Sequence, residues 1–178
     1  MSDKGSEIDD LVAPLVSFRR DLHAHPELAY EERRTSRKIE EALRQLGLEV
    51  HTGIGGTGVV ASLKVGSSDR AIGLRADMDA LPFHEETGLP YASRNPGVFH
   101  GCGHDGHVAM LLGAAQQLAR TRRFDGTVHF IFQPAEETCE GARSLVEQGV
   151  LQGVDAILAL HLDPERPVLR GTAQNPDV

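Results

Sequence analysis

The order in which apolar runs follow one another constrains the fold of this chain more than any other feature. After two helical stretches, short β-rich runs separated by glycine alternate with segments of helical periodicity. A helix is predicted to begin after Gly103 and to run to about Arg122, and another is predicted to end at Gly149. Four runs are predicted strands: 57–65, 71–74, 127–133 and 154–160. This alternation predicts an α/β sandwich around a largely parallel sheet.

The remaining segments give more specific expectations. The run at 154–160 is apolar throughout, so we expect a strand that is buried on both faces. The proline-containing segment 80–99 is expected to be a long surface loop. The first helix covers about 8–22, with a kink or restart at Pro14, and the second covers about 31–46. Between these helices lie four ionisable residues, His23, His25, Glu27 and Glu31. A polar helix junction explains this cluster more simply than a functional site.

The composition is that of one domain of ordinary size. Of the 178 residues, 40% are hydrophobic and 25% are charged. A net charge of −8 without a basic stripe argues against a nucleic-acid partner. No apolar run approaches the roughly 20 residues of a membrane span, and the acidic N-terminus lacks a signal-peptide core. Cys102 and Cys139 make no disulfide framework and fit a reducing compartment. We therefore expect a cytoplasmic protein that binds neither nucleic acid nor membrane.

A glycine-rich loop carries the densest cluster of metal-binding side chains. The segment from His100 to His107 contains three imidazoles, one thiol and one carboxylate. Cys102 and His104 lie two residues apart, so both side chains can turn toward one point. A soft thiolate beside a neutral imidazole suits a divalent transition metal such as zinc, manganese, cobalt or nickel. The alternative is that this segment is only a turn before a buried helix and that its histidines have no common function. The density of donors favours metal binding instead.

Polar residues also follow three of the predicted strands, at 75–79, 133–137 and His161. In open α/β sheets, ligands bind outside the carboxyl ends of the strands. We therefore expect these residues and the glycine-rich loop to form one site. Its donors would be Cys102, His104, one glutamate of 133–137 and His161.

The adjacent carboxylates Glu136 and Glu137 suggest what such a site does. On extended backbone neighbouring side chains point to opposite sides, so only one of the two binds an ion easily. The other can take a proton from water, which suits metal-assisted hydrolysis. The site could hold one ion or two ions about 3.5–4 Å apart, or four protein donors could close a structural site. Asp77 either orients a ligating imidazole or is one of the acids of a turn after a strand.

Four motifs are spread along the chain between residues 20 and 137, and the match that they carry extends to about His161. They are RDLHAHPE at 20–27, LRADMDALP at 74–82, HGCGHDGH at 100–107 and FQPAEE at 132–137. In residue type, order and spacing they resemble the metal-dependent hippurate hydrolase and N-acyl-amino-acid amidohydrolase family, whose relatives include aminoacylases and plant auxin-conjugate hydrolases.

The resemblance implies a function and a role for individual residues. Cys102, His104, Glu137 and His161 would be metal ligands, Glu136 would be the general base, and the cofactor would be a divalent metal, with two ions expected. The reaction would be hydrolysis of the amide bond of an N-acyl amino acid, such as hippurate or an N-acetyl amino acid. The fold would be a three-layer sandwich with a mixed sheet, like that of zinc exopeptidases.

The family continues beyond the matching motifs with a lid and dimerisation domain, and then with a C-terminal catalytic portion that supplies a last metal-binding histidine. Residues 1–162 are therefore expected to be the N-terminal portion of the catalytic domain, and 163–178 an irregular tail. Without the last ligand, the chain could be an inactive metal-binding fragment or an interaction module. A structural metal site is a further alternative, although it leaves Glu136 without a purpose. Apolar surface left uncovered on the sheet favours self-association.

Overall fold

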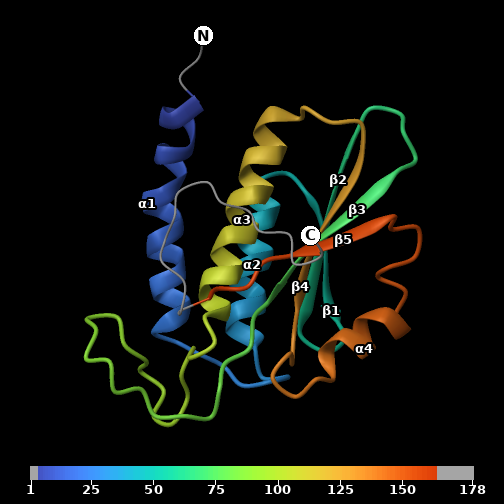
Figure 1. Cartoon of the computed structure of the whole chain (residues 1–178). Coiled ribbons are helices and arrows are strands. Elements are labelled where there is room, and N and C mark those ends of the chain that lie inside the picture. The colour runs from blue at the N-terminus through green and yellow to red at the C-terminus, as the bar shows by residue number, and fades with distance from the viewer. Residues whose placement is uncertain (1–3, 164–178) are drawn as a thin grey trace.

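The computed structural model describes residues 4–163, with side chains from Asp10 onward. In chain order the elements are α1 (Lys4–His23), α2 (Arg33–Gln45), β1 (Glu49–Ile54), β2 (Gly58–Val65), β3 (Ala71–Asp77), α3 (His104–Thr121), β4 (Gly126–Gln133), α4 (Gly141–Glu147) and β5 (Ala156–Ala159) (Figure 1). None of the helices in this range combines the length and apolar character that a membrane span requires. The predicted irregular tail lies outside the described residues, apart from Asp163.

The strands form one mixed sheet in the order β1-β2-β4-β3-β5. β2 pairs antiparallel with β1 and β4, whereas β3 pairs parallel with β4 and β5. Helices α1, α2 and α3 lie on one face of the sheet and the short α4 lies on the other, which gives three layers (Figure 1). The predicted α/β three-layer fold with a mixed sheet is confirmed, with the parallel pairs on the β4-β3-β5 side.

Alternation along β4 divides the apolar core between the two faces. Phe130 and Phe132 are fully buried in the large cluster beneath α1, α2 and α3. Ile131, between them in the sequence, packs with Val60 and Leu145 on the α4 side. Because successive strand residues point to opposite faces, one strand supplies both cores.

The parallel strands bring three polar segments to one edge of the sheet. In the register of β3 with β4, Asp77 is opposite Gln133. In the register of β3 with β5, Arg75 is opposite Ala159. The residues that follow β3, β4 and β5 therefore leave the sheet at the same edge, beside the N-terminus of α3. This edge is where the sequence predicts the site.

Strand β5 differs from its prediction. The sequence predicts a strand at 154–160 that is buried on both faces, but β5 spans only Ala156–Ala159 and all four of its residues are exposed. β5 is the last strand in the sheet order, and in the described part of the chain it pairs with β3 alone. Its apolar composition therefore produces an exposed apolar edge instead of a buried central strand.

Two elements near the N-terminus also depart from the sequence prediction. Strand β1 is not predicted, because it lies at the other sheet edge and Val50 is its one buried residue, so its apolar periodicity is weak. Helix α1 is not interrupted at Pro14 but runs through it to His23. The helix does end before Pro26, as expected from the restriction that proline places on the preceding residue.

The segment between β3 and α3 is largely irregular, as predicted for 80–99. Leu81 and Phe99 exchange backbone hydrogen bonds of 2.9 Å in both directions and so close the base of this loop. Glu85 contacts Nε2 of His23 at 3.2 Å and accepts the N–H of Ser93 at 2.6 Å. These contacts attach the loop to α1 and deliver the chain to the glycine-rich segment before α3.

Candidate metal centre

The six predicted site residues all lie in one cluster at the carboxyl edge of β3, β4 and β5. Among the described residues, three groups have ligand atoms within 4.8 Å of one another: Cys102, His104 and His161; Asp77, His104 and His107; and His104, Glu136 and Glu137. His104 belongs to every group, so the three are parts of one site. The sequence places His107 in the glycine-rich cluster but gives it no role in the site.

His104 presents one ring nitrogen to this cluster. Its Nδ1–H donates to the backbone oxygen of Asp79 at 2.9 Å, which leaves the lone pair on Nε2. Nε2 lies 3.6 Å from Asp77 Oδ1 and 3.7 Å from both Glu136 Oε2 and Glu137 Oε1. Both Nε2 and Glu137 Oε1 are buried without a hydrogen-bond partner in the described part of the chain. Since buried polar atoms are normally paired, these two facing atoms fit a divalent cation between them.

Cys102 and His161 meet although they lie on different elements. The Cys102 thiol lies 3.4 Å from Nε2 of His161, whose Nδ1–H donates to the Leu162 oxygen at 2.7 Å. The N–H of Leu162 donates to Nε2 of His107 at 2.9 Å. The Leu162 side chain lies so close to Gly103 that a Cβ there would be 2.8 Å from it. The segment after β5 is thereby fixed over the start of α3, and His161 is brought to Cys102.

Asp77 orients an imidazole, but that imidazole is His107. Asp77 Oδ1 accepts the Nδ1–H of His107 at 2.6 Å, and Oδ2 accepts Arg75 Nη1 at 2.8 Å. These partners hold the pKa of Asp77 below its ordinary value although burial opposes them. The spacing of His107 from His104 by three residues on one helix, which places both on one face, is the signal that could have found it.

The Glu136–Glu137 pair lies on a turn and not on extended backbone. After β4, Ala135 adopts a left-handed conformation with φ of 49°, and 136–139 form the turn. Asp79 accepts the backbone N–H groups of Glu136 and Glu137, each at 3.0 Å. Both carboxylates consequently approach His104 Nε2, so the expectation that they point to opposite sides is wrong. They differ in exposure instead, at 37% for the Glu136 side chain and 21% for that of Glu137.

Burial and neighbouring acids set the protonation of the cluster in the protein alone. Burial, together with the contact and charge of Glu137, raises the pKa of the Cys102 thiol to about 11. Burial raises the pKa of Glu137 as well, and the charges of the nearby acids raise it further. The opposing effect of His104 is too small to cancel this rise. For His104 burial lowers the pKa, but the contact with Asp79 and the nearby carboxylates outweigh burial and raise it. A divalent cation favours the thiolate and the neutral imidazole, so its binding releases protons.

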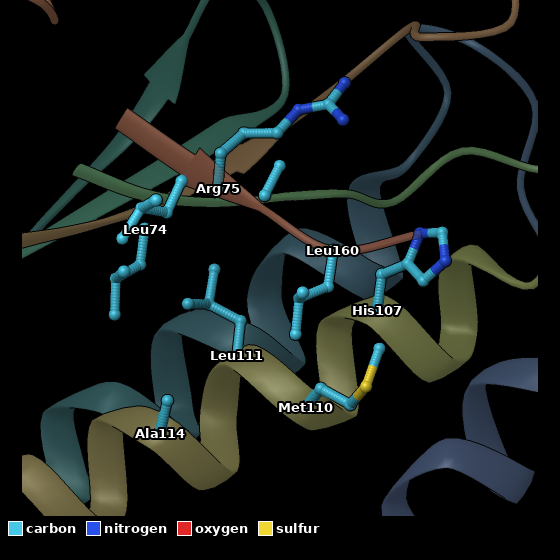
Figure 2. A pocket seen from close by; sticks show the side chains of 9 residues that line it. Leu74, Arg75, His107, Met110, Leu111, Ala114 and Leu160 are labelled. Carbon is cyan, nitrogen blue, oxygen red and sulfur yellow. The ribbon is translucent and has the colours of Figure 1, made fainter. Parts of the chain in front are cut away.

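An apolar pocket of about 340 Å³ adjoins the cluster, between α3 and strands β3 and β5 (Figure 2). Met110, Leu111 and Leu160 line it together with residues of the strands. His107 lines the same pocket, so this apolar surface is continuous with the candidate metal centre.

The remaining sequence candidates lie outside the cluster. Cys139 is exposed on the turn, and it joins none of the candidate groups among the described residues. Glu27 accepts two backbone N–H groups at the start of α2, at 2.9 and 2.8 Å, and so caps that helix. His23 Nδ1 contacts Asp105 Oδ2 at 2.8 Å. The Glu27 contacts support the predicted polar junction between α1 and α2, whereas His23 contacts the first turn of α3.

Known proteins share both the fold and the sequence of this chain. The crystal structure of a dinuclear metal-binding peptidase of the M20 family from Bacillus subtilis has a TM-score of 0.86 and 45% identity, and the match covers 90% of this chain and 46% of that one. The N-acetylcysteine deacetylase of Bacillus subtilis is 47% identical over 156 residues, which are 86% of this chain and 41% of the relative. The hippurate hydrolase of Campylobacter jejuni is 47% identical over 150 residues, which are 84% of this chain and 39% of the relative.

The chain spans about two fifths of the length of the curated relatives that it matches. The sequence model of peptidase family M20/M25/M40 matches residues 73–175, which are more than half of the chain and include every predicted site residue. The resemblance carried by the four motifs is thereby confirmed. This chain belongs to peptidase family M20/M25/M40.

Proposed function

We propose that this chain supplies the metal centre of a divalent-metal-dependent amidohydrolase that cleaves N-acyl amino acids. The observation that carries the proposal is the pair of buried, unpaired atoms His104 Nε2 and Glu137 Oε1, which lie 3.7 Å apart. The relatives named N-acetylcysteine deacetylase and hippurate hydrolase support the substrate class.

Cys102, His104, Glu137 and His161 are the proposed ligands. A thiolate with imidazoles suits zinc, cobalt or nickel, and the carboxylates extend the choice to manganese. The dinuclear peptidase among the structural relatives supports two ions. When bound, such ions polarise a carbonyl and lower the pKa of water.

Glu136 is the proposed general base. Its carboxylate is the more exposed of the pair, so it can meet water from the solvent side while Oε2 stays 3.7 Å from His104 Nε2. There it accepts a proton from the attacking water and can return that proton to the leaving nitrogen. Asp79 fixes the backbone of the pair, and this fixes the direction from which the Glu136 carboxylate approaches.

Hydrolysis of N-acetylcysteine, other N-acetyl amino acids and hippurate by the purified chain tests the proposal. Reactions contain manganese or zinc, or EDTA as the control, and Glu136→Gln is assayed in parallel. We expect slow turnover, below about one per second, because His161 and β5 are exposed and solvent weakens the electrostatic interactions of the site. Turnover that survives EDTA or Glu136→Gln would contradict the proposal. Metal binding without any hydrolysis would favour the metal-binding module instead.

We also propose a cytoplasmic location. Both cysteines are free thiols, and the proposed ligand Cys102 binds an ion only in its reduced form. Such thiols persist in a reducing compartment.

A further inference from the structure

Glu32, which precedes α2, is a carboxylate with no exposed surface. Its Oε1 accepts the N–H of Ala135 at 2.9 Å, and its Oε2 accepts the Thr57 hydroxyl at 2.5 Å. The backbone N–H groups of Glu32 and Tyr30 also contact the carboxylate. Burial raises the pKa of Glu32 in spite of these donors. Because burial of an acid costs free energy, the groups that the Glu32 carboxylate contacts indicate its role.

A local role in capping α2 does not account for these contacts. Glu32 makes no side-chain capping hydrogen bond, and the carboxylate of Glu27 accepts the first N–H groups of the helix instead. Thr57 lies in the turn between β1 and β2, and Ala135 lies after β4. Glu32 therefore connects the start of α2 to two segments that are distant from it in the sequence.

The segment after β4 depends on such contacts because its backbone is unusual. Ala135 has a φ of 49°, a left-handed conformation that residues with a side chain seldom adopt. Three consecutive N–H groups of this segment donate to carboxylates. That of Ala135 donates to Glu32 at 2.9 Å. Those of Glu136 and Glu137 donate to Asp79 at 3.0 Å.

We infer that Glu32 is a positioning residue for the Glu136–Glu137 pair and that it acts through the N–H of Ala135. The inference rests on the metal centre proposed above and adds a residue that lies outside it. Loss of the Glu32 carboxylate leaves the Ala135 N–H buried without an acceptor. The backbone then relaxes away from the left-handed conformation and moves both carboxylates relative to His104 Nε2, from which each now lies 3.7 Å.

Cobalt(II) titration of the whole chain tests this inference, with the visible absorption spectrum of bound cobalt as the measure of ligand geometry. The variants are Glu32→Leu and Glu32→Gln, whose amide oxygen can still accept the Ala135 N–H. The control is Ile39→Ala, in the helix that Glu32 precedes and also fully buried, but packed in the large apolar cluster. Urea unfolding of each variant reports the stability that it loses.

We expect Glu32→Leu to weaken cobalt binding roughly 10–100-fold and to change the spectrum, as for other residues that orient ligands. Glu32→Gln should retain part of the cobalt affinity and part of the wild-type spectrum. Ile39→Ala should bind cobalt like the wild type. Where Glu32→Leu does not fold, Glu32→Asp takes its place, because its shorter side chain draws the carboxylate away from the Ala135 N–H. A wild-type spectrum and affinity in Glu32→Asp then overturn the inference. Equal loss of affinity in Ile39→Ala and Glu32→Leu overturns it as well, because stability alone would then set binding. A wild-type chain that binds no cobalt would overturn the metal centre itself, which separates that failure from the others.

Discussion

The thiol of Cys102 lies 3.4 Å from Nε2 of His161, although 59 residues separate them in the sequence. Cys102 belongs to the loop before α3, and His161 follows β5. The pKa of this thiol is about 11, so the sulfur is protonated at neutral pH. An ion must displace that proton to bind the sulfur, and metal affinity should therefore rise with pH.

Removal of single ligands should lower the metal content of the protein. We expect Cys102→Ala and His104→Ala to bind less metal than the wild type after dialysis, with the greater loss for His104→Ala because His104 belongs to every candidate group. Cys139→Ala is the matched control, since it removes an exposed thiol outside these groups. Elemental analysis of the dialysed proteins gives the answer. Unchanged metal content in both ligand variants would show that the site is elsewhere.

The two glutamates should differ in what they do, although both approach His104. Glu136→Gln should keep the metal and lower turnover by about 10²–10⁴-fold, as expected for loss of a general base. Glu137→Gln should lower metal affinity itself, because Glu137 Oε1 is buried and has no other partner in the described part of the chain. Isothermal titration with zinc measures the metal affinity of each variant, and this affinity is compared with the turnover of the same variant. Weakened zinc binding in Glu136→Gln alone would reverse the assignment.

His100 should make the stability of the protein depend on pH in a defined window. The residue is 4% exposed, and neither ring nitrogen has a hydrogen-bond partner among the described residues. Burial lowers the pKa of His100 from 6.5 to about 4. Between these values the unfolded chain binds a proton that the folded chain does not, so His100 destabilises the fold progressively as pH falls from 6.5 to 4.

His100→Leu should remove this dependence without loss of a hydrogen bond. Between pH 7.5 and pH 5 the variant should gain about 2 kcal/mol in free energy of unfolding relative to the wild type, since one pKa unit corresponds to about 1.4 kcal/mol. Urea unfolding at both pH values measures the difference. If the difference in free energy of unfolding between variant and wild type does not change with pH, the lowered pKa of His100 is disproved.

The apolar edge at β5 should cause self-association. Leu158 is 59% exposed, Leu160 is 73% exposed and Met110 is 40% exposed, and all three line the pocket shown in Figure 2. Exposed apolar patches and open strand edges both favour contact with another chain. We expect the mean mass in sedimentation experiments to rise with protein concentration. Leu160→Lys should suppress that rise, and Val146→Lys, at a 55% exposed position on α4, should not. Equal masses at all concentrations for the wild type would contradict the prediction.

The sequence predicts the place of the site because strand order and residue type suffice for it. Apolar runs locate β3, β4 and β5, and parallel pairing brings the residues after them to one edge. Cys102, His104 and His161 are unusual residue types directly next to these runs. The sequence alone therefore predicts that these side chains converge.

Other parts of the site depend on backbone geometry, which residue types do not reveal. Asp79 and Glu32 act by accepting backbone N–H groups, and no side-chain pattern marks their partners. The left-handed turn occurs at Ala135, where no glycine signals it. The apolar run of β5 predicts surface that is suited to burial, but the run cannot show whether another segment covers it.

The proposed ligands come from three separate segments: the loop before α3 with the first residue of α3, the turn after β4, and the residues after β5. These segments are far apart in the unfolded chain, so an ion that they hold binds the folded state alone. At a free metal concentration one hundred times the Kd, such binding adds about 2.7 kcal/mol to the free energy of unfolding. The resistance of this protein to proteases then follows the supply of metal in the cell, independently of any substrate that it meets.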